Sequence, residues 1–188
     1  MASLSRDSVS AMGFSQVGAN VQVSDRASIY GAENISIGKN VRIDDFVVLS
    51  AGSGGIEIGN NVHIAVFSSL IGAEKIHVSD FANISSRVSV YSSSDDFSGS
   101  SLTNPTVPET YKDVKNAPVS IGRHVIIGSG CVILPGVSIG DGAAIGALSL
   151  VTKSCKSFSI YVGIPAKYVK DRKQSLLEME RAYLNTNQ

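Results

Sequence analysis

Three histidines, His63, His77 and His124, are the side chains in this sequence best suited to move a proton near neutral pH. A histidine can act as a general base, taking a proton from a nucleophile that attacks a carbonyl group. To do so it must lie within hydrogen-bond reach of the reacting group, so its side chain has to face a site that a substrate can enter. The chemistry therefore depends on where the backbone places these three residues.

A second set of reactive residues gathers near the C-terminal end, at Lys153, Lys156, Lys167 and Lys170. Ammonium groups are compact charges that suit phosphates, so this cluster predicts a site for a phosphate-bearing ligand. The alternative is a solvated basic surface. The whole chain of 188 residues is balanced, with 16 Lys and Arg against 16 Asp and Glu, and it has no Trp. This composition argues against nucleic-acid partners.

A six-residue period identifies the elements that must position these residues. Aliphatic side chains recur at Ile121, Ile127, Ile133, Ile139, Ile145 and Val151. Upstream, the same spacing occurs in threes, from Val17, Val23 and Ile29 to Val78, Ile84 and Val90. Neither an amphipathic helix nor a simple alternating strand fits this spacing. A chain that turns a corner every six residues does, because three such segments close one triangular coil.

The expected fold is therefore all-β, a left-handed parallel β-helix of about six coils. Each periodic aliphatic residue would point into the prism, and so would the small or β-branched residue four places later. Examples of the second kind are Val41, Val62, Ala82, Val125 and Val137. Gly, Asn and Asp stand where corners need permissive backbone, and successive coils would pair their backbones about 4.8 Å apart.

The period also divides the chain into parts. Residues 1–16 are expected to form an N-terminal cap with a helix near 3–14, for which Ser3 or Ser5 is a candidate N-cap. Residues 17–157 would form the β-helix, and the Ser-, Asp- and Pro-rich stretch 92–117 breaks it as a long loop. Residues 158–188 would be a C-terminal segment ending in a helix. The stripe on that helix would include Leu176, Leu177, Met179, Glu180 and Leu184.

Strand alternation then selects among the histidines. A residue just before an inward aliphatic must point outward, so Arg42, His63 and Asn83 would form one outward ladder on successive coils. Arg42 is expected to keep His63 neutral, as a base requires. Asp95 or Asp96, from the loop of the same or a neighbouring subunit, would orient His63. We therefore expect His63 to be the catalytic base.

The other two histidines are weaker candidates. His124 lies at a corner, where it also suits turn chemistry, and His77 faces another side with no partner that the repeat predicts. Three histidines are also the number that a zinc site of the γ-class carbonic anhydrase type requires. They face different sides and lack the spacing of such a site, so no metal is expected.

The ordered motifs IGRHVIIGSGCV, ILPGV, IGALSLVTK and GIPAK, together with the loop after the fourth coil, resemble the bacterial hexapeptide acyltransferases. Within these, the chain looks like the sugar O-acetyltransferases of the galactoside and maltose type. It looks closer still to the acetyltransferases of surface-polysaccharide and lipopolysaccharide biosynthesis. The resemblance covers residues 17–172. It implies acetyl-CoA as co-substrate, a sugar acceptor, and a homotrimer with active sites between subunits.

The resemblance also assigns CoA contacts to six residues. These are Ser129 near the thioester, Ala147 at the pantetheine amides through its backbone, Thr152 and Lys153 at the lower part of CoA, and Lys167 and Lys170 at its phosphates.

One feature departs from the family. Galactoside-type enzymes carry their catalytic histidine at the start of the long loop, directly after the strand that here ends at Val90. This chain has YSSSDDFSG there, so that base cannot be carried over. Acetyl-CoA-dependent O-acetylation of a polysaccharide-precursor sugar is the first expectation. The alternative is N-acetylation of an amino-sugar nucleotide, since an amine can shed its proton to water or through the CoA sulfur. A non-catalytic interaction prism is a third possibility.

The N-terminus has no apolar signal-peptide core, and no run approaches the roughly 18 apolar residues of a membrane span. We therefore expect a cytoplasmic protein that does not insert into membranes.

Overall fold

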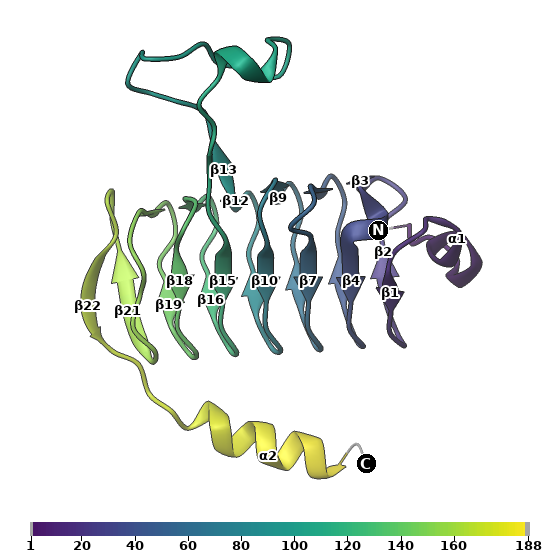
Figure 1. The fold of residues 1–188 in the computed structure, drawn as a ribbon. Helices are drawn as coiled ribbons and strands as arrows, with labels where there is room; N and C mark the ends of the chain where they lie inside the picture. Colours follow the sequence, from purple (N-terminus) through teal and green to yellow (C-terminus); the bar gives the residue numbers. More distant parts are fainter. Residues whose placement is uncertain (1, 187–188) are drawn as a thin grey trace.

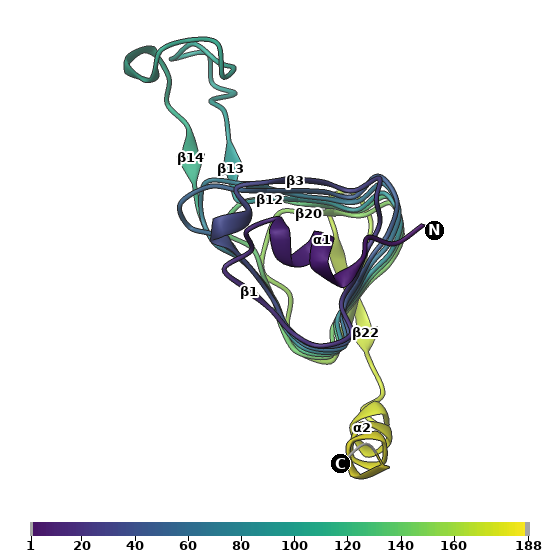
Figure 2. The ribbon, with the colours of Figure 1, turned by 90° about the vertical axis from the view of Figure 1, so that its right-hand side faces the viewer.

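The computed structural model describes residues 2–186 and shows a triangular prism built from stacked coils of chain (Figure 1). Three parallel sheets form its faces, because each coil contributes one short strand to each face before the next coil begins. The second face has seven parallel strands, so the solenoid makes about seven turns where the sequence period predicts six. Viewed along the axis, the coils overlie one another closely (Figure 2).

The three faces are named here in the order in which the chain meets them. Sheet 1 holds β1 (Gln16–Val17), β4 (Ile35–Ile37), β7 (Ile56–Ile58), β10 (Ile76–Val78), β15 (Val119–Ile121) and β18 (Ser138–Ile139). Sheet 2 holds β2 (Gln22–Val23), β5 (Arg42–Ile43), β8 (His63–Ile64), β11 (Asn83–Ile84), β16 (Ile126–Ile127), β19 (Ala144–Ile145), β21 (Ser159–Val162) and β22 (Lys167–Asp171). Sheet 3 holds β3 (Ser28–Tyr30), β6 (Val48–Ala51), β9 (Ser69–Gly72), β12 (Ser89–Tyr91), β17 (Val132–Ile133) and β20 (Leu150–Val151).

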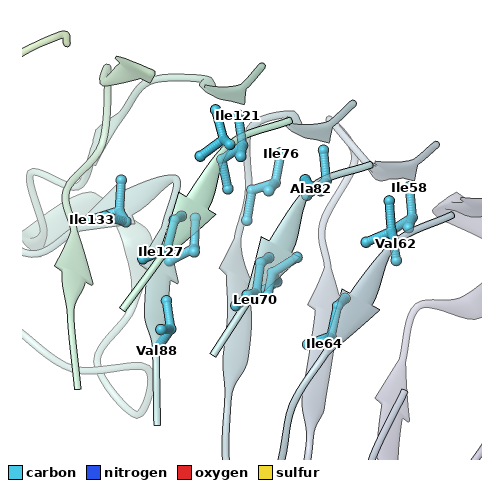
Figure 3. Close-up of a cluster of buried hydrophobic side chains, with 14 of the residues drawn as sticks. Ile58, Val62, Ile64, Leu70, Ile76, Ala82, Val88, Ile121, Ile127 and Ile133 are labelled. Carbon is cyan, nitrogen blue, oxygen red and sulfur yellow. The ribbon is translucent and has the colours of Figure 1, made fainter. Parts of the chain in front are cut away.

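The core is a column of aliphatic side chains inside the prism (Figure 3). The periodic residues line up from coil to coil, as Ile64, Ile84 and Ile127 do in sheet 2. The second set of inward residues is buried too, from Val62 to Val125. Both predicted inward positions are confirmed, and their packing stabilises the fold because neighbouring coils bury each other's apolar faces.

Corners join the faces. The first corner, between sheets 1 and 2, turns through residues such as 59–62, and the second corner, between sheets 2 and 3, turns through residues such as 85–88. In most turns of both corners the third residue has a positive φ. Asparagine tolerates this backbone, and in the first corner Asn20, Asn40 and Asn61 also hydrogen-bond one another in series.

The loop at 92–117 leaves the third corner, between sheets 3 and 1, and projects far from the prism (Figures 1 and 2). It is not entirely irregular, as its composition suggests. Its stem is a two-stranded antiparallel ribbon of β13 (Ser93–Ser94) and β14 (Lys115–Asn116), and its outer part holds the short helix η2 (Glu109–Tyr111). The ribbon fixes the direction in which the loop leaves the prism.

The two ends of the prism are finished differently. The helix α1 (Arg6–Ala11) lies across the N-terminal opening, with Ser5 as its N-cap and Val9 buried in the core (Figure 2). Near the same end, the short helix η1 (Ala32–Asn34) leads into β4. At the other end β21 adds the seventh turn and β22 reverses direction to pair with it antiparallel. The sequence period did not predict β22, because the period ends at Val151.

The helix α2 (Leu176–Thr186) follows β22 and returns alongside the prism below the first corner (Figures 1 and 2). It begins later than the polar segment from which it was predicted, because residues 167–171 are used for β22. Among residues 2–186, no helix has the length and apolar character needed to cross a membrane.

Candidate functional site

A pocket of about 520 Å³ lies where the long loop leaves the prism. It is lined by Tyr91, Ser93, Ser94, Asp95, Phe97, Leu134, Pro135 and Leu150. The floor of the pocket comes from sheet 3 and the third corner. Its wall comes from the β13 stem and the residues after it. Most of the lining surface is apolar, and Asp95 supplies the carboxylate at its edge. A reacting group could be held there against a single charged side chain.

The two aspartates that were predicted together have different environments. Asp95 is exposed in this pocket, whereas Asp96 is buried. The Asp96 carboxylate accepts hydrogen bonds from the main-chain N–H groups of Ser98, Ser100 and Ser101. Hydrogen bonds from Ser98 and then Ser101 outweigh desolvation and hold the pKa of Asp96 far below its usual value. Asp96 thus organises the loop, and the side chain free for chemistry is that of Asp95.

The C-terminal motif GIPAK lies directly beside this pocket. Its Gly163 carbonyl accepts a hydrogen bond from Leu150 N–H, and its Ala166 N–H donates to the Leu150 carbonyl. Leu150 therefore joins the two sites, because its side chain lines the pocket and its backbone anchors the motif. Lys167 follows Ala166 at the start of β22 and is exposed.

The other predicted donor-site residues lie on the same end of the prism. Thr152 and Lys153 are exposed just after β20, two and three residues beyond Leu150 of the pocket wall, and Lys170 is exposed on β22. Ser129 and Ala147 occupy the second position of successive turns at the second corner, where the Leu148 N–H donates to the Ser129 carbonyl. In the described chain the main-chain N–H of Ala147 donates to no acceptor, and so it is available to a ligand carbonyl.

The predicted ladder exists in sheet 2. Arg42 pairs with His63, and His63 pairs with Asn83, on adjacent strands. Sequence reasoning missed the carboxylate beside them, Asp44, whose two oxygens accept from Arg42 Nε at 2.6 Å and approach His63 Nε2 at 2.9 Å. Arg42 was expected to act on His63 directly, but Asp44 bridges the two groups. Asp44 could have been found from its position two residues after Arg42, since both then face the same way.

Asp44 is nearly buried at its side chain, with 8% exposed. Desolvation raises the pKa of its carboxyl group, but the hydrogen bonds and charges of His63 and Arg42 outweigh it and lower the pKa below its usual value. Within the described chain, therefore, Asp44 and not a loop aspartate orients His63. Pairing with Asp95 or Asp96 of another subunit stays a prediction.

His77 has partners that the repeat should have predicted. Its Nδ1 lies 3.1 Å from Glu57 Oε2 on the preceding strand, and its Nε2 lies 3.0 Å from Ser79 Oγ. Glu57 also pairs with Lys75. The expectation that His77 has no such partner is wrong, because a coil of 20 residues places Glu57 directly beside it. The cluster lies on the outer face of sheet 1.

His124 connects the prism to α2. It lies at the first corner with φ 58°, stacks on Phe81 with ring centroids 4.9 Å apart, and its Nε2 lies 2.7 Å from Glu180 Oε2. Burial, followed by the charges of Arg123 and Arg172, lowers the pKa of His124. A neutral imidazole donating from Nε2 to Glu180 fits this environment. An apolar pocket of about 400 Å³ lies between α2 and this corner.

No group of three or more His, Cys, Asp or Glu among residues 2–186 is arranged to hold a metal ion. Cys131 and Cys155 are buried, and burial raises the pKa of both thiols, that of Cys155 to about 11. Thiols with raised pKa values are poor nucleophiles, so the two cysteines serve packing.

The repeat region matches a known family. Residues 118–153 fit the bacterial transferase hexapeptide family, in a pattern of six repeats. Over 183 residues the chain is 54% identical to a dTDP-4-amino-4,6-dideoxy-D-glucose acyltransferase of Escherichia coli, and the match covers 97% of this chain and 95% of that protein.

Solved structures give the same result. The crystal structure of AntD, an N-acyltransferase from Bacillus cereus in complex with dTDP and 3-hydroxybutyryl-CoA, is 46% identical, with a TM-score of 0.92 over 99% of this chain and 98% of that one. A maltose O-acetyltransferase from Clostridium difficile 630 is 24% identical, with a TM-score of 0.61 over 90% of this chain and 75% of that one, and so shares the fold.

The repeat, the fold and a relative of matching length that is 54% identical agree with one another. The chain belongs to the hexapeptide-repeat family of bacterial transferases, and it is an acyltransferase.

Proposed function

We propose that this enzyme transfers an acyl group from acyl-CoA to the amino group of a nucleotide-linked amino sugar, with a dTDP-linked 4-amino-4,6-dideoxyhexose as its acceptor class. The observation that carries the proposal is the pocket holding Asp95 beside the lysine-bearing end of the prism. This pocket lies in the loop where galactoside-type enzymes carry a histidine, and an aspartate stands there instead.

The donor would bind at the C-terminal end. Lys153, Lys167 and Lys170 are exposed there and can hold the phosphates of CoA. The pantetheine arm would pass the second corner, where the Ala147 N–H is available, and the thioester would reach Ser129. The Escherichia coli and Bacillus cereus relatives support this assignment, since the latter binds CoA derivatives and dTDP.

The chemistry is direct acyl transfer. The amine lone pair attacks the thioester carbonyl, a C–N bond forms, and the C–S bond breaks as the CoA thiolate leaves. One proton must leave the nitrogen, and it can pass to the sulfur or to water. Asp95 would accept a hydrogen bond from the amine and hold it in line with the carbonyl. A strong protein base is thus unnecessary, which agrees with a loop that has no histidine.

O-acetylation of a polysaccharide-precursor sugar, the first expectation from the sequence, is less well supported. An alcohol must lose its proton as it attacks, which calls for a general base near the thioester. His63 is paired with Asp44 on sheet 2, whereas the loop stem leaves the corner between sheets 3 and 1. A role for His63 would require a neighbouring subunit to bring the two together.

We further propose the homotrimer that the family resemblance implies. Residues of the loop and of the second corner lie on different edges of one prism (Figure 2). A site containing both Asp95 and Ser129 would then form between adjacent subunits.

The test is an acceptor panel with purified enzyme. Release of CoA thiol would be followed with acetyl-CoA and dTDP-4-amino-4,6-dideoxyglucose, and compared with its 4-hydroxy analogue and with galactosides and maltose. We expect rapid thiol release with the amino sugar alone and an amide in the product by mass spectrometry. Ester formation on a hydroxyl sugar, with none on the amine, would rule out the proposal.

A further inference from the structure

Four residues form a continuous exposed stack on the second corner, at the third position of successive turns. In order along the prism they are Arg26, Phe46, Phe67 and Arg87. The two phenyl rings stack with centroids 4.9 Å apart and an interplanar angle of 11°. The Arg26 guanidinium lies 5.7 Å from the Phe46 ring and that of Arg87 lies 5.6 Å from the Phe67 ring.

The turn itself does not require these residues. Phe46 and Phe67 have φ values of 60° and 61°, a backbone that a bulky side chain adopts at a cost and that Asn or Gly adopts more readily. The first corner uses Asn at Asn40 and Asn61 for the same backbone. Aromatic rings at such positions therefore suggest a use other than turning the chain.

The stack is also uncovered. Phe46 and Phe67 are 45% and 52% exposed. Phe81, which has the same backbone at the first corner, is instead packed against His124 and Tyr183. Arg87 is exposed and forms no ion pair within residues 2–186, so its guanidinium remains available to an anion.

We infer that this stack binds the nucleotide of the acceptor, with the pyrimidine base against the exposed edges of Phe46 and Phe67 and the diphosphate on Arg87. The inference rests on the proposed function. Ring edges carry partial positive charge and pack well against a base, and a planar guanidinium pairs with phosphate oxygens through two hydrogen bonds.

The order of groups along the corner supports the assignment. Rungs of the prism are spaced about 4.8 Å apart, and the turn after that of Arg87 carries Ser129, which is proposed to lie near the thioester. Base, diphosphate and amino sugar would thus follow the corner from Phe67 past Arg87 toward Ser129. Two rungs span roughly 10 Å, which a diphosphate and a sugar ring can bridge. Donor and acceptor would enter from opposite ends of the prism and meet in the middle.

The test is titration calorimetry of the full-length protein with dTDP, dUDP and CoA. Phe67→Leu and Arg87→Ala should each weaken dTDP binding about tenfold, the scale of one base-stacking or charged contact, and leave CoA affinity within about twofold. The matched control is Phe81→Leu, the same residue type and backbone at the other corner, which should not change dTDP affinity. Because dUDP lacks the thymine methyl group, it should bind the unchanged protein more weakly than dTDP, and Phe67→Leu should shrink that difference.

The outcomes separate the two proposals. If the unchanged protein binds no dTDP and does not acylate the amino sugar, the proposed function fails. If the unchanged protein binds dTDP and acylates the amino sugar, while Phe67→Leu and Arg87→Ala bind dTDP with unchanged affinity, only this inference fails. If Phe67→Leu and Arg87→Ala lose dTDP and CoA binding equally and their sedimentation coefficient changes, the stack is a subunit contact. That result would also overturn this inference. Arg87→Ala changes an exposed side chain, so it keeps the test valid should Phe67→Leu not fold.

Discussion

Asp95 and Asp96 are adjacent in the long loop, yet at the scale of single residues they have different partners. Asp96 is committed to three serine N–H groups, whereas Asp95 lies in the pocket. Such a division depends on the path of an irregular loop, which no period predicts.

The first prediction separates these roles. Asp95→Asn should lower kcat for acyl transfer about 100-fold, the scale of the loss when a reacting group is held out of line, and leave the loop intact. Asp96→Asn should instead make the loop sensitive to limited proteolysis, because its hydrogen bonds fix residues 98–101. Equal kcat for Asp95→Asn and the unchanged enzyme would remove Asp95 from the reaction.

The second prediction concerns Asp44. Its pKa is lowered in the fold, so its contribution to stability is present above its unfolded pKa, near 3.9. That contribution is lost as the pH falls through the lower, folded pKa. Asp44→Asn should therefore reduce the free energy of unfolding by about 1–2 kcal/mol at pH 7, and the difference should vanish on strong acidification. Urea denaturation at several pH values would measure it, and a difference independent of pH would contradict the linkage.

The third prediction concerns the donor phosphates. Lys167→Ala should weaken binding of acetyl-CoA about tenfold, the loss of one charge-assisted contact, with little change in kcat at saturation. Lys39→Ala, which changes another exposed lysine in the opposite half of the prism, serves as the control. Affinities measured by titration calorimetry that are the same in both variants would move the phosphate site elsewhere.

At the scale of elements, the six-residue period predicted the strands and side chains that repeat from coil to coil, and it missed the elements that lie outside the repeat. The ladder of Arg42, His63 and Asn83 follows from strand alternation alone, and so does the aliphatic column of the core. The strand β22 was missed because an antiparallel closing strand belongs to no coil and carries no six-residue signal. Asp44 was missed because it stands in a corner, where the period assigns turn chemistry only.

The helix α2 contacts the prism through Glu180, which pairs with both Arg123 and His124, and through Tyr183, which donates to Asn61 and packs on Phe81. Glu180→Gln should loosen this attachment and raise amide hydrogen exchange in residues 176–186 about tenfold, since it removes the charge that pairs with the nearly buried His124 and with Arg123, which keeps only Asp80 as an ion-pair partner. Glu178→Gln is the control, because that side chain is exposed on the same helix. Identical exchange in the two variants would mean that apolar contacts hold α2.

At the scale of the whole molecule, the six-residue period predicts the architecture of one prism but not an active site shared between prisms. In the proposed trimer, Asp95 in the loop of one prism would meet Ser129 at the second corner of the next prism. Sequence periodicity describes the interior of one prism, so contacts between prisms lie outside what it can predict.

The proposed trimer makes its own prediction. Asp95→Asn and Ser129→Arg variants, each strongly impaired alone, should show more acyl transfer when unfolded and refolded together than either does by itself, because a mixed trimer then contains a site with both native residues. Sedimentation of the mixture checks that trimers have formed. Mixed trimers without any recovered activity would place both residues of each site in the same subunit.

The two different ends of the prism have a consequence of their own. Stacked parallel strands with an aliphatic interior are the arrangement that amyloid fibrils extend without limit, one layer after another. Here α1 lies over the first layer, and at the other end the reversed strand β22 interrupts the parallel order of sheet 2. The enzyme can thus be regarded as a fibril of fixed length, whose two ends do not repeat the layer that a fibril would copy.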